Sequence, residues 1–166
     1  MVWGMTLGTF TAVHVVLSLI GIGAGLVVLI GLISGRHFGV WTALFLAATV
    51  LTCVTGFGFP VDHVLPSHIV GVVSLVVLAL AIVALYQLHL RGVWRAIYVV
   101  SAGLALYFNV FVGVVQAFLK VPALHALAPQ QTEPPFVIAQ LLVLALFVLL
   151  TVVAVRRVRG EALARA

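Results

Sequence analysis

The sequence predicts an all-α membrane protein, a single bundle of five transmembrane helices formed by residues 1–166. Its composition is the first observation behind this prediction: 65% of the residues are hydrophobic and 7% are charged, whereas soluble domains carry about a quarter charged residues. The second is five apolar stretches that reach the ~20 residues a helix needs to cross a bilayer. Together these observations exclude a soluble globular domain, a disordered segment and a nucleic-acid-binding protein.

The five predicted spans follow one another with short connections. They are rich in Leu, Val and Ala and lack the alternating pattern of membrane β-strands. Because a backbone in hydrocarbon must satisfy its own hydrogen bonds, we expect helices. In chain order the spans are Phe10–Ile33, Val40–Phe59, Ser67–Leu88, Trp94–Phe118 and Pro135–Val155.

Local signals mark the ends of these spans. No cation precedes Arg36, so we expect the first span to remain as a helix rather than be removed as a signal peptide. Glycine and proline bound the others: Gly56, Gly58 and Pro60 after the second, Pro66 before the third, Pro134 and Pro135 at the fifth. After Pro122, the run Ala123–Leu127 predicts a short interfacial helix.

The charges predict the orientation. Five spans place Lys120, Asp62 and Glu133 on one side of the membrane. Cytoplasmic segments carry an excess of Lys and Arg, and we therefore expect the N-terminus outside and the C-terminus in the cytoplasm. The seven cations on the predicted cytoplasmic side are Arg36, Arg91, Arg95, Arg156, Arg157, Arg159 and Arg165.

The polar side chains of the spans lie toward the predicted outer side, and the inner halves are mostly aliphatic. Polar groups are costly inside a membrane, so this asymmetry is informative. It argues against a channel or proton pump, which needs polar groups along its whole length. It predicts an outward-facing polar pocket above an apolar base. The predicted pocket residues are His14, Cys53, His68, Asn109, Gln116 and Gln140.

Two histidines suggest what the pocket could bind. Imidazoles from two helices, here His14 and His68, could ligate a haem iron or form part of a zinc or copper site. His63 could add a third metal ligand. A b-type haem, a transition metal and a quinone headgroup are therefore the cofactors considered. The alternative is that these side chains only hydrogen-bond neighbouring helices. The small residues Gly21 and Gly25 similarly favour close packing within the bundle over dimerisation.

Two functions from different classes remain open at this point. One is a small membrane protein that binds a ligand or cofactor in the outer pocket. The other is a structural or assembly subunit with no ligand of its own, which contacts a partner membrane protein or a second copy. With three acidic residues in the whole chain and no catalytic triad or phosphate-binding loop, the sequence does not favour an enzyme.

Several segments resemble a family of small, uncharacterised bacterial inner-membrane proteins. They are Thr55-Gly-Phe-Gly-Phe-Pro60, Leu65 to Leu75, Lys120-Val-Pro-Ala-Leu124, Ala128-Pro129, Glu133-Pro-Pro-Phe136 and His14-Val-Val-Leu-Ser-Leu-Ile-Gly21. The resemblance covers nearly the whole chain. It implies a multi-pass protein of the bacterial plasma membrane, and it implies no activity and no catalytic residue.

Overall fold

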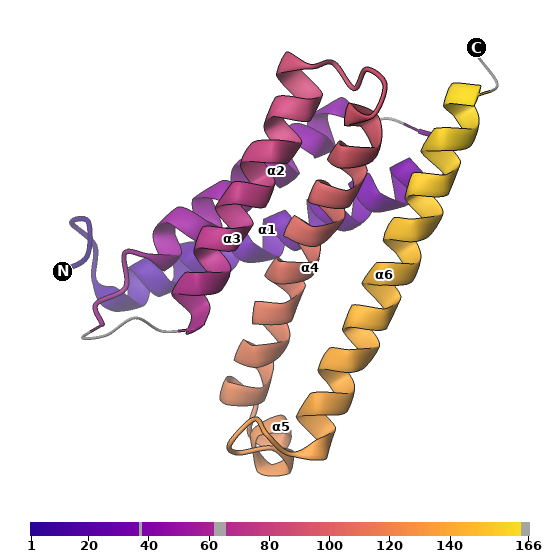
Figure 1. The fold of residues 1–166 in the computed structure, drawn as a ribbon. Coiled ribbons are helices and arrows are strands. Elements are labelled where there is room, and N and C mark those ends of the chain that lie inside the picture. The colour runs from indigo at the N-terminus through magenta and orange to yellow at the C-terminus, as the bar shows by residue number, and fades with distance from the viewer. Residues whose placement is uncertain (37, 62–65, 164–166) are drawn as a thin grey trace.

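The predicted helical bundle is confirmed by the computed structural model, which describes residues 1–36, 38–61 and 66–163 (Figure 1). Five of its helices are long and apolar enough to cross a membrane. The chain is therefore a multi-pass membrane protein in contact with the lipid bilayer. The long helices are α1 (Leu7–Ile33), α2 (Gly39–Gly56), α3 (Pro66–Ile82), α4 (Trp94–Lys120) and α6 (Pro134–Leu163).

Two short elements complete the fold. A single π-helical turn, η1 (Val83–Gln87), extends α3. The short helix α5 (Pro122–Leu127) connects α4 to α6, beside the ends of both (Figure 1). The helix predicted after Pro122 is thus confirmed, with that proline in its first turn, where its missing N–H costs nothing.

Several span boundaries differ from the predictions: α1 begins three residues before Phe10 and α4 ends two residues after Phe118. Two further differences have a clear physical cause. Helix α2 ends at Gly56, three residues before Phe59, because the N–H groups of Phe57 and Gly58 turn back to the carbonyls of Val54 and Thr55. These i→i+3 bonds tighten the last turn and stop the helix. Helix α6 continues beyond Val155 and through three arginines. Arginine is a good helix former, and its long side chain reaches the membrane surface from inside a helix.

Helix α4 packs between α3 and α6, and α1 contacts α2, α4 and α6. Figure 1 shows α4 and α6 running side by side, with α1, α2 and α3 gathered beside them. The centre of these contacts is a core of large buried side chains that includes Val28, Phe45, Leu78, Leu106 and Phe147.

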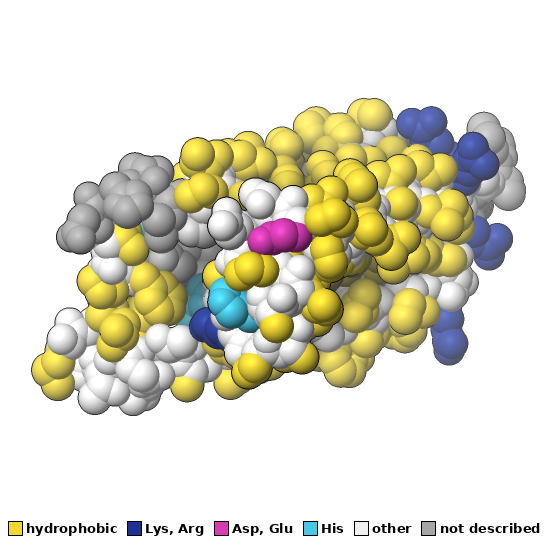
Figure 2. Space-filling view, turned by 90° about the horizontal axis from the view of Figure 1, so that it is seen from below, with side chains coloured by type: hydrophobic (Ala, Val, Ile, Leu, Met, Phe, Trp, Pro, Cys, Tyr) yellow, Lys and Arg dark blue, Asp and Glu magenta, His cyan; other side chains and the backbone are white. Residues whose placement is uncertain are grey.

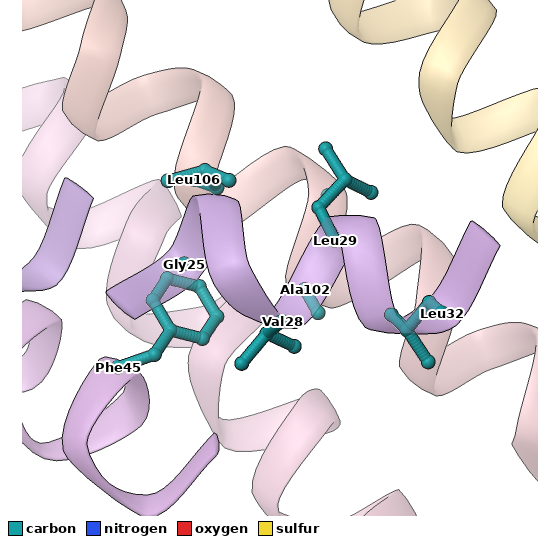
Figure 3. Close-up of a pocket in the computed structure, with 8 residues that line it drawn as sticks. Gly25, Val28, Leu29, Leu32, Phe45, Ala102 and Leu106 are labelled. Carbon is teal, nitrogen blue, oxygen red and sulfur yellow. The ribbon is translucent and has the colours of Figure 1, made fainter. Parts of the chain in front are cut away.

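Helices α1, α2 and α4 approach one another closely at Gly25 (Figure 3). A Cβ atom there would lie 2.6 Å from Cδ1 of Leu106 in α4 and 2.8 Å from the ring of Phe45 in α2. The expected close packing within the bundle is therefore confirmed. A void of about 10 Å³ remains beside this crossing. Its lining is apolar, and it is at the lower limit for one water molecule, so we expect it to be dry.

The outward face of α6 is apolar. Leu141, Leu142 and Leu149 are 57%, 66% and 60% exposed. Water would disfavour such a surface, whereas lipid tails are as apolar as leucine. This face therefore contacts lipid.

The two ends of the bundle differ in charge, as predicted. The arginine-rich end carries Arg36, Arg91, Arg95, Arg156, Arg157 and Arg159, and most Lys and Arg side chains in Figure 2 gather at one side of the molecule. The opposite end carries Lys120 and Glu133, and we call it the Lys120 end. Which end faces the cytoplasm stays a prediction.

Candidate functional site

His14 forms the most specific polar contact of the Lys120 end. It lies on α1, and its Nδ1 atom is 2.8 Å from Oγ1 of Thr55 in the last turn of α2. The edge of one ring faces the plane of the other between His14 and Phe59, with 5.2 Å between the ring centres. The imidazole is half-buried. Its orientation is therefore set by a hydrogen bond on one side and an aromatic ring on another.

The bonds of Thr55 favour one tautomer of His14. The Thr55 hydroxyl lies 2.7 Å from the carbonyl oxygen of Leu51, to which it can donate. When its single hydrogen makes that bond, the same oxygen accepts the N–H of His14 Nδ1. In this tautomer of the neutral imidazole, Nε2 carries the lone pair that can accept a hydrogen bond. Histidines that ligate metals commonly donate their other N–H to an oxygen in this way.

One turn further into the membrane, a second polar pair connects α1 to α4. Ser18 donates from Oγ to Oδ1 of Asn109 at 2.9 Å, and the Asn109 amide donates to the Ser18 carbonyl oxygen at 3.4 Å. A Cβ atom at Gly21 would lie 3.0 Å from both the Asn109 amide nitrogen and the Thr49 hydroxyl. Three helices therefore meet around Gly21, and Asn109 is satisfied by protein atoms.

Gln140 bridges α6 to α4. Its Nε2 donates to the carbonyl oxygen of Phe111 at 3.2 Å, and the side chain is nine-tenths buried. Its Oε1 atom is buried and takes no hydrogen bond from the described residues. Gln116, also predicted to face the pocket, is exposed on α4.

The remaining predicted residues lie around α2 and α3. Cys53 is half-buried beside Ser74 of α3. His68, at the start of α3, stacks on the ring of Phe57 at 5.7 Å between ring centres. His63 lies outside the described residues.

The predicted site residues are thus distributed over several helix contacts. His14 pairs with α2, Asn109 with α1 and Gln140 with α4. His14 and His68 pack against different aromatic rings. Within the part of the chain that the structure describes, no three or more His, Cys, Asp or Glu side chains form a group that could hold a metal ion. Haem or metal binding stays a prediction.

The sequence analysis missed a cavity at the arginine-rich end. It has a volume of about 280 Å³, and its polar lining residues are Arg36, Thr42, Tyr86 and Tyr98. This cavity lies in the half of the bundle whose spans are mostly aliphatic, and Thr42 is one of the few polar side chains there. The signal was present: hydroxyl-bearing residues recur near the same ends of three spans.

Comparison of the chain with family models, with curated proteins and with solved structures finds no match.

Proposed function

We propose that the chain is a multi-pass protein of a bacterial plasma membrane that binds the polar head of an amphiphile at His14. The observation that carries the proposal is the contact between His14 Nδ1 and the Thr55 hydroxyl, because an N–H on Nδ1 leaves the lone pair of Nε2 able to accept a hydrogen bond. A free acceptor in a membrane span calls for a hydrogen-bond donor. A hydroquinone headgroup is such a donor, carried on an apolar tail.

The surroundings of His14 support a ring-shaped headgroup. Phe59 packs against the imidazole, and Phe10 packs against Phe59 with 5.0 Å between the ring centres. Aromatic rings favour edge-to-face and offset contacts with further rings. Lys120 is close enough to interact electrostatically with the imidazole.

The test is to identify what co-purifies with the protein. Wild type, His14→Phe and His125→Phe are purified in a mild detergent, and their organic extracts are compared by mass spectrometry. His125 is the matched control because it is exposed on α5 at the same end. We expect about one hydroquinone or quinone per chain in wild type and His125→Phe, and its loss from His14→Phe.

Two results would overturn the proposal. One is retention of the compound by His14→Phe, and the other is an extract of wild type that contains no quinone-type compound. An optical spectrum and an elemental analysis of the same sample complete the experiment. A Soret band would identify the ligand as a haem instead of a quinone, and a bound metal would identify it as a metal ion.

A structural or assembly role is the second candidate, and a specific observation favours it. In the half of the bundle at the Lys120 end, three helix contacts are each bridged by one polar pair. The pairs are His14 with Thr55, Ser18 with Asn109, and Gln140 with the Phe111 carbonyl. This role predicts that His14→Ala lowers stability while no ligand is lost. It also predicts a membrane-protein partner or second copy in native purification. A protein that purifies only as a partner-free monomer would contradict it.

A further inference from the structure

The cavity at the arginine-rich end has an apolar wall and a polar side, as a binding site for an amphiphile does. It lies among α1, α2, η1 and α4, and its volume of about 280 Å³ is close to the lower end of the range for ligand pockets. Val28 and Leu32 line it from α1, and Leu85 lines it from η1. These side chains give the cavity an apolar wall that an acyl chain could contact.

Arg36 is held at the rim of the cavity by the backbone. Gly35 has φ +68°, and the Arg36 N–H donates to the carbonyl oxygen of Gly31 at 2.8 Å. Together they form the Schellman motif that ends many helices. Gly31 is required there because a Cβ atom would lie 2.8 Å from both the Arg36 carbonyl oxygen and the Phe38 ring. The chain therefore turns sharply under α1 and brings Arg36 to the cavity.

The side chain of Arg36 is available to a ligand. It is exposed, and its guanidinium lies 5.8 Å above the centre of the Phe38 ring. Stacking on an aromatic face leaves the N–H groups at the edge of the guanidinium free to donate. Arginine binds phosphate through paired N–H groups of this kind.

Three hydroxyl groups accompany the guanidinium. Tyr98 is buried on α4, beside Thr42 of α2. Tyr86 is exposed on η1 and lines the same cavity. A guanidinium with neighbouring hydroxyls presents several donors to one oxyanion. The polar side of the cavity is thus suited to a phosphate group.

The wall formed by η1 has an unusual backbone. The Leu88 N–H donates to the Val83 carbonyl oxygen across five residues, and the Leu90 N–H donates to Ala84 across six. Leu90 lines the cavity with φ +55°, a left-handed conformation that costs a side-chain-bearing residue energy. Single π-helical turns occur frequently at functional sites. This wall keeps its shape at an energetic cost.

We propose that this cavity binds an anionic phospholipid. Its phosphate meets Arg36 and the hydroxyls of Tyr86 and Tyr98, and one acyl chain lies along Val28 and Leu32. Charge complementarity selects this occupant, since the end that contains the cavity also carries the arginines. Basic pockets between transmembrane helices recognise anionic headgroups in this way. The proposal is independent of the site at His14, which lies at the other end.

The test is lipid binding by the intact protein in detergent micelles, followed by native mass spectrometry. The two probes are phosphatidylglycerol and phosphatidylcholine with identical acyl chains. We expect wild type to bind phosphatidylglycerol about tenfold more tightly, which a charge-assisted bidentate contact can provide. Arg36→Gln should remove this preference. Arg159→Gln is the matched control, because Arg159 is an exposed arginine of the same end that does not line the cavity.

A second variant tests the contact between the acyl chain and the apolar wall of the cavity. Gly39 lines the cavity at the start of α2, and a Cβ atom there meets nothing within 4 Å, so we expect Gly39→Leu to fold. It should weaken binding of both lipids. Equal binding of the two lipids by wild type, or unchanged selectivity in Arg36→Gln, would overturn the proposal. So would equal losses in Arg36→Gln and Arg159→Gln, unchanged lipid binding in Gly39→Leu, or displacement of the lipid by inorganic phosphate.

Discussion

A Cβ atom at Gly25 of α1 would lie 2.6 Å from Cδ1 of Leu106 of α4. Real Cβ atoms do not approach other heavy atoms so closely, so a side chain at position 25 would have to displace Leu106, which is 1% exposed. The Phe45 ring, 1% exposed, closes the other side of the same crossing. The core of the bundle depends on this contact because it brings three helices together.

Gly25→Ala should therefore lower the free energy of unfolding by about 1–3 kcal/mol, the usual cost of overpacking a well-packed core. Gly23→Ala is the control on the same helix, since a Cβ atom at Gly23 meets nothing within 4 Å. That variant should be neutral or stabilised by up to ~1 kcal/mol, because alanine favours helix. Thermal unfolding in detergent measures both. Equal stability of the two variants would contradict the crossing geometry.

The hydrogen bond between His14 and Thr55 should contribute measurably to stability. Thr55→Val removes the acceptor of His14 Nδ1 and should cost about 0.6–1.7 kcal/mol, the range for hydrogen bonds between membrane helices. Thr52→Val is the control, because the Thr52 hydroxyl donates to the Ala48 carbonyl oxygen within α2. A double-mutant cycle with His14→Ala isolates the pair. A coupling energy of zero would mean that the contact does not stabilise the protein.

The spans could be predicted from the sequence because membrane thickness imposes a length and an apolar composition on each helix. The separation of charges could be predicted for a similar reason, since alternating spans determine which loops share a side. The short helix after Pro122 followed from local turn and helix signals. Each of these features is determined by the sequence of single segments and does not depend on how the helices pack together.

The polar contacts could not be predicted in the same way. Which side chains meet depends on how far each helix rotates and where two helices cross. His14 thus pairs with Thr55, and His68 stacks instead on Phe57. The cavity at the arginine-rich end was missed for the same reason, because Thr42 and Tyr98 come together only when α2 and α4 pack.

Gln140 and Asn109 are both buried amides, but the Oε1 atom of Gln140 has no hydrogen-bond partner among the described residues. We therefore expect their replacement to affect the stability of the protein differently. Gln140→Met removes the unpaired Oε1 acceptor together with the Nε2 donor to the Phe111 carbonyl, so a gain and a loss oppose each other and stability should change by less than about 0.6 kcal/mol. Asn109→Met removes a side chain paired in both directions with Ser18 and should cost about 0.6–1.7 kcal/mol. Unfolding in detergent compares the two. A loss at Gln140 as large as that at Asn109 would show that Oε1 has a partner in the membrane.

The loop before α6 should loosen at acidic pH. Partial desolvation raises the pKa of the Glu133 carboxyl, but hydrogen bonds from backbone N–H groups outweigh it and hold this pKa below its ordinary value of 4.5. The donors include Gln130, at 3.1 Å, and Thr132, at 3.0 Å. A lowered folded-state pKa means that the stabilisation is fully present above pH 4.5 and is lost as the pH falls through the folded value.

Hydrogen exchange of the Gln130 and Thr132 amides measures this loosening. Their protection should be constant above pH 4.5 and should decrease below it. Glu133→Gln cannot ionise and should remove the pH dependence while leaving the exchange of the core helices unchanged. Protection that depends on pH equally in Glu133→Gln would assign the effect to another group.

The positive-inside pattern predicts that the arginine-rich end faces the cytoplasm. Cys53 is the only cysteine of the chain, so Cys53→Ala provides a background for single-cysteine labelling. Ala126→Cys is placed on the exposed face of α5, and Val93→Cys at an exposed position of the arginine-rich end. A membrane-impermeant maleimide should label position 126 in intact cells and position 93 only after permeabilisation. Labelling of both in detergent verifies their reactivity. The reverse pattern in cells would mean that the arginines face outward, which would place the cavity beside Arg36 in the other leaflet.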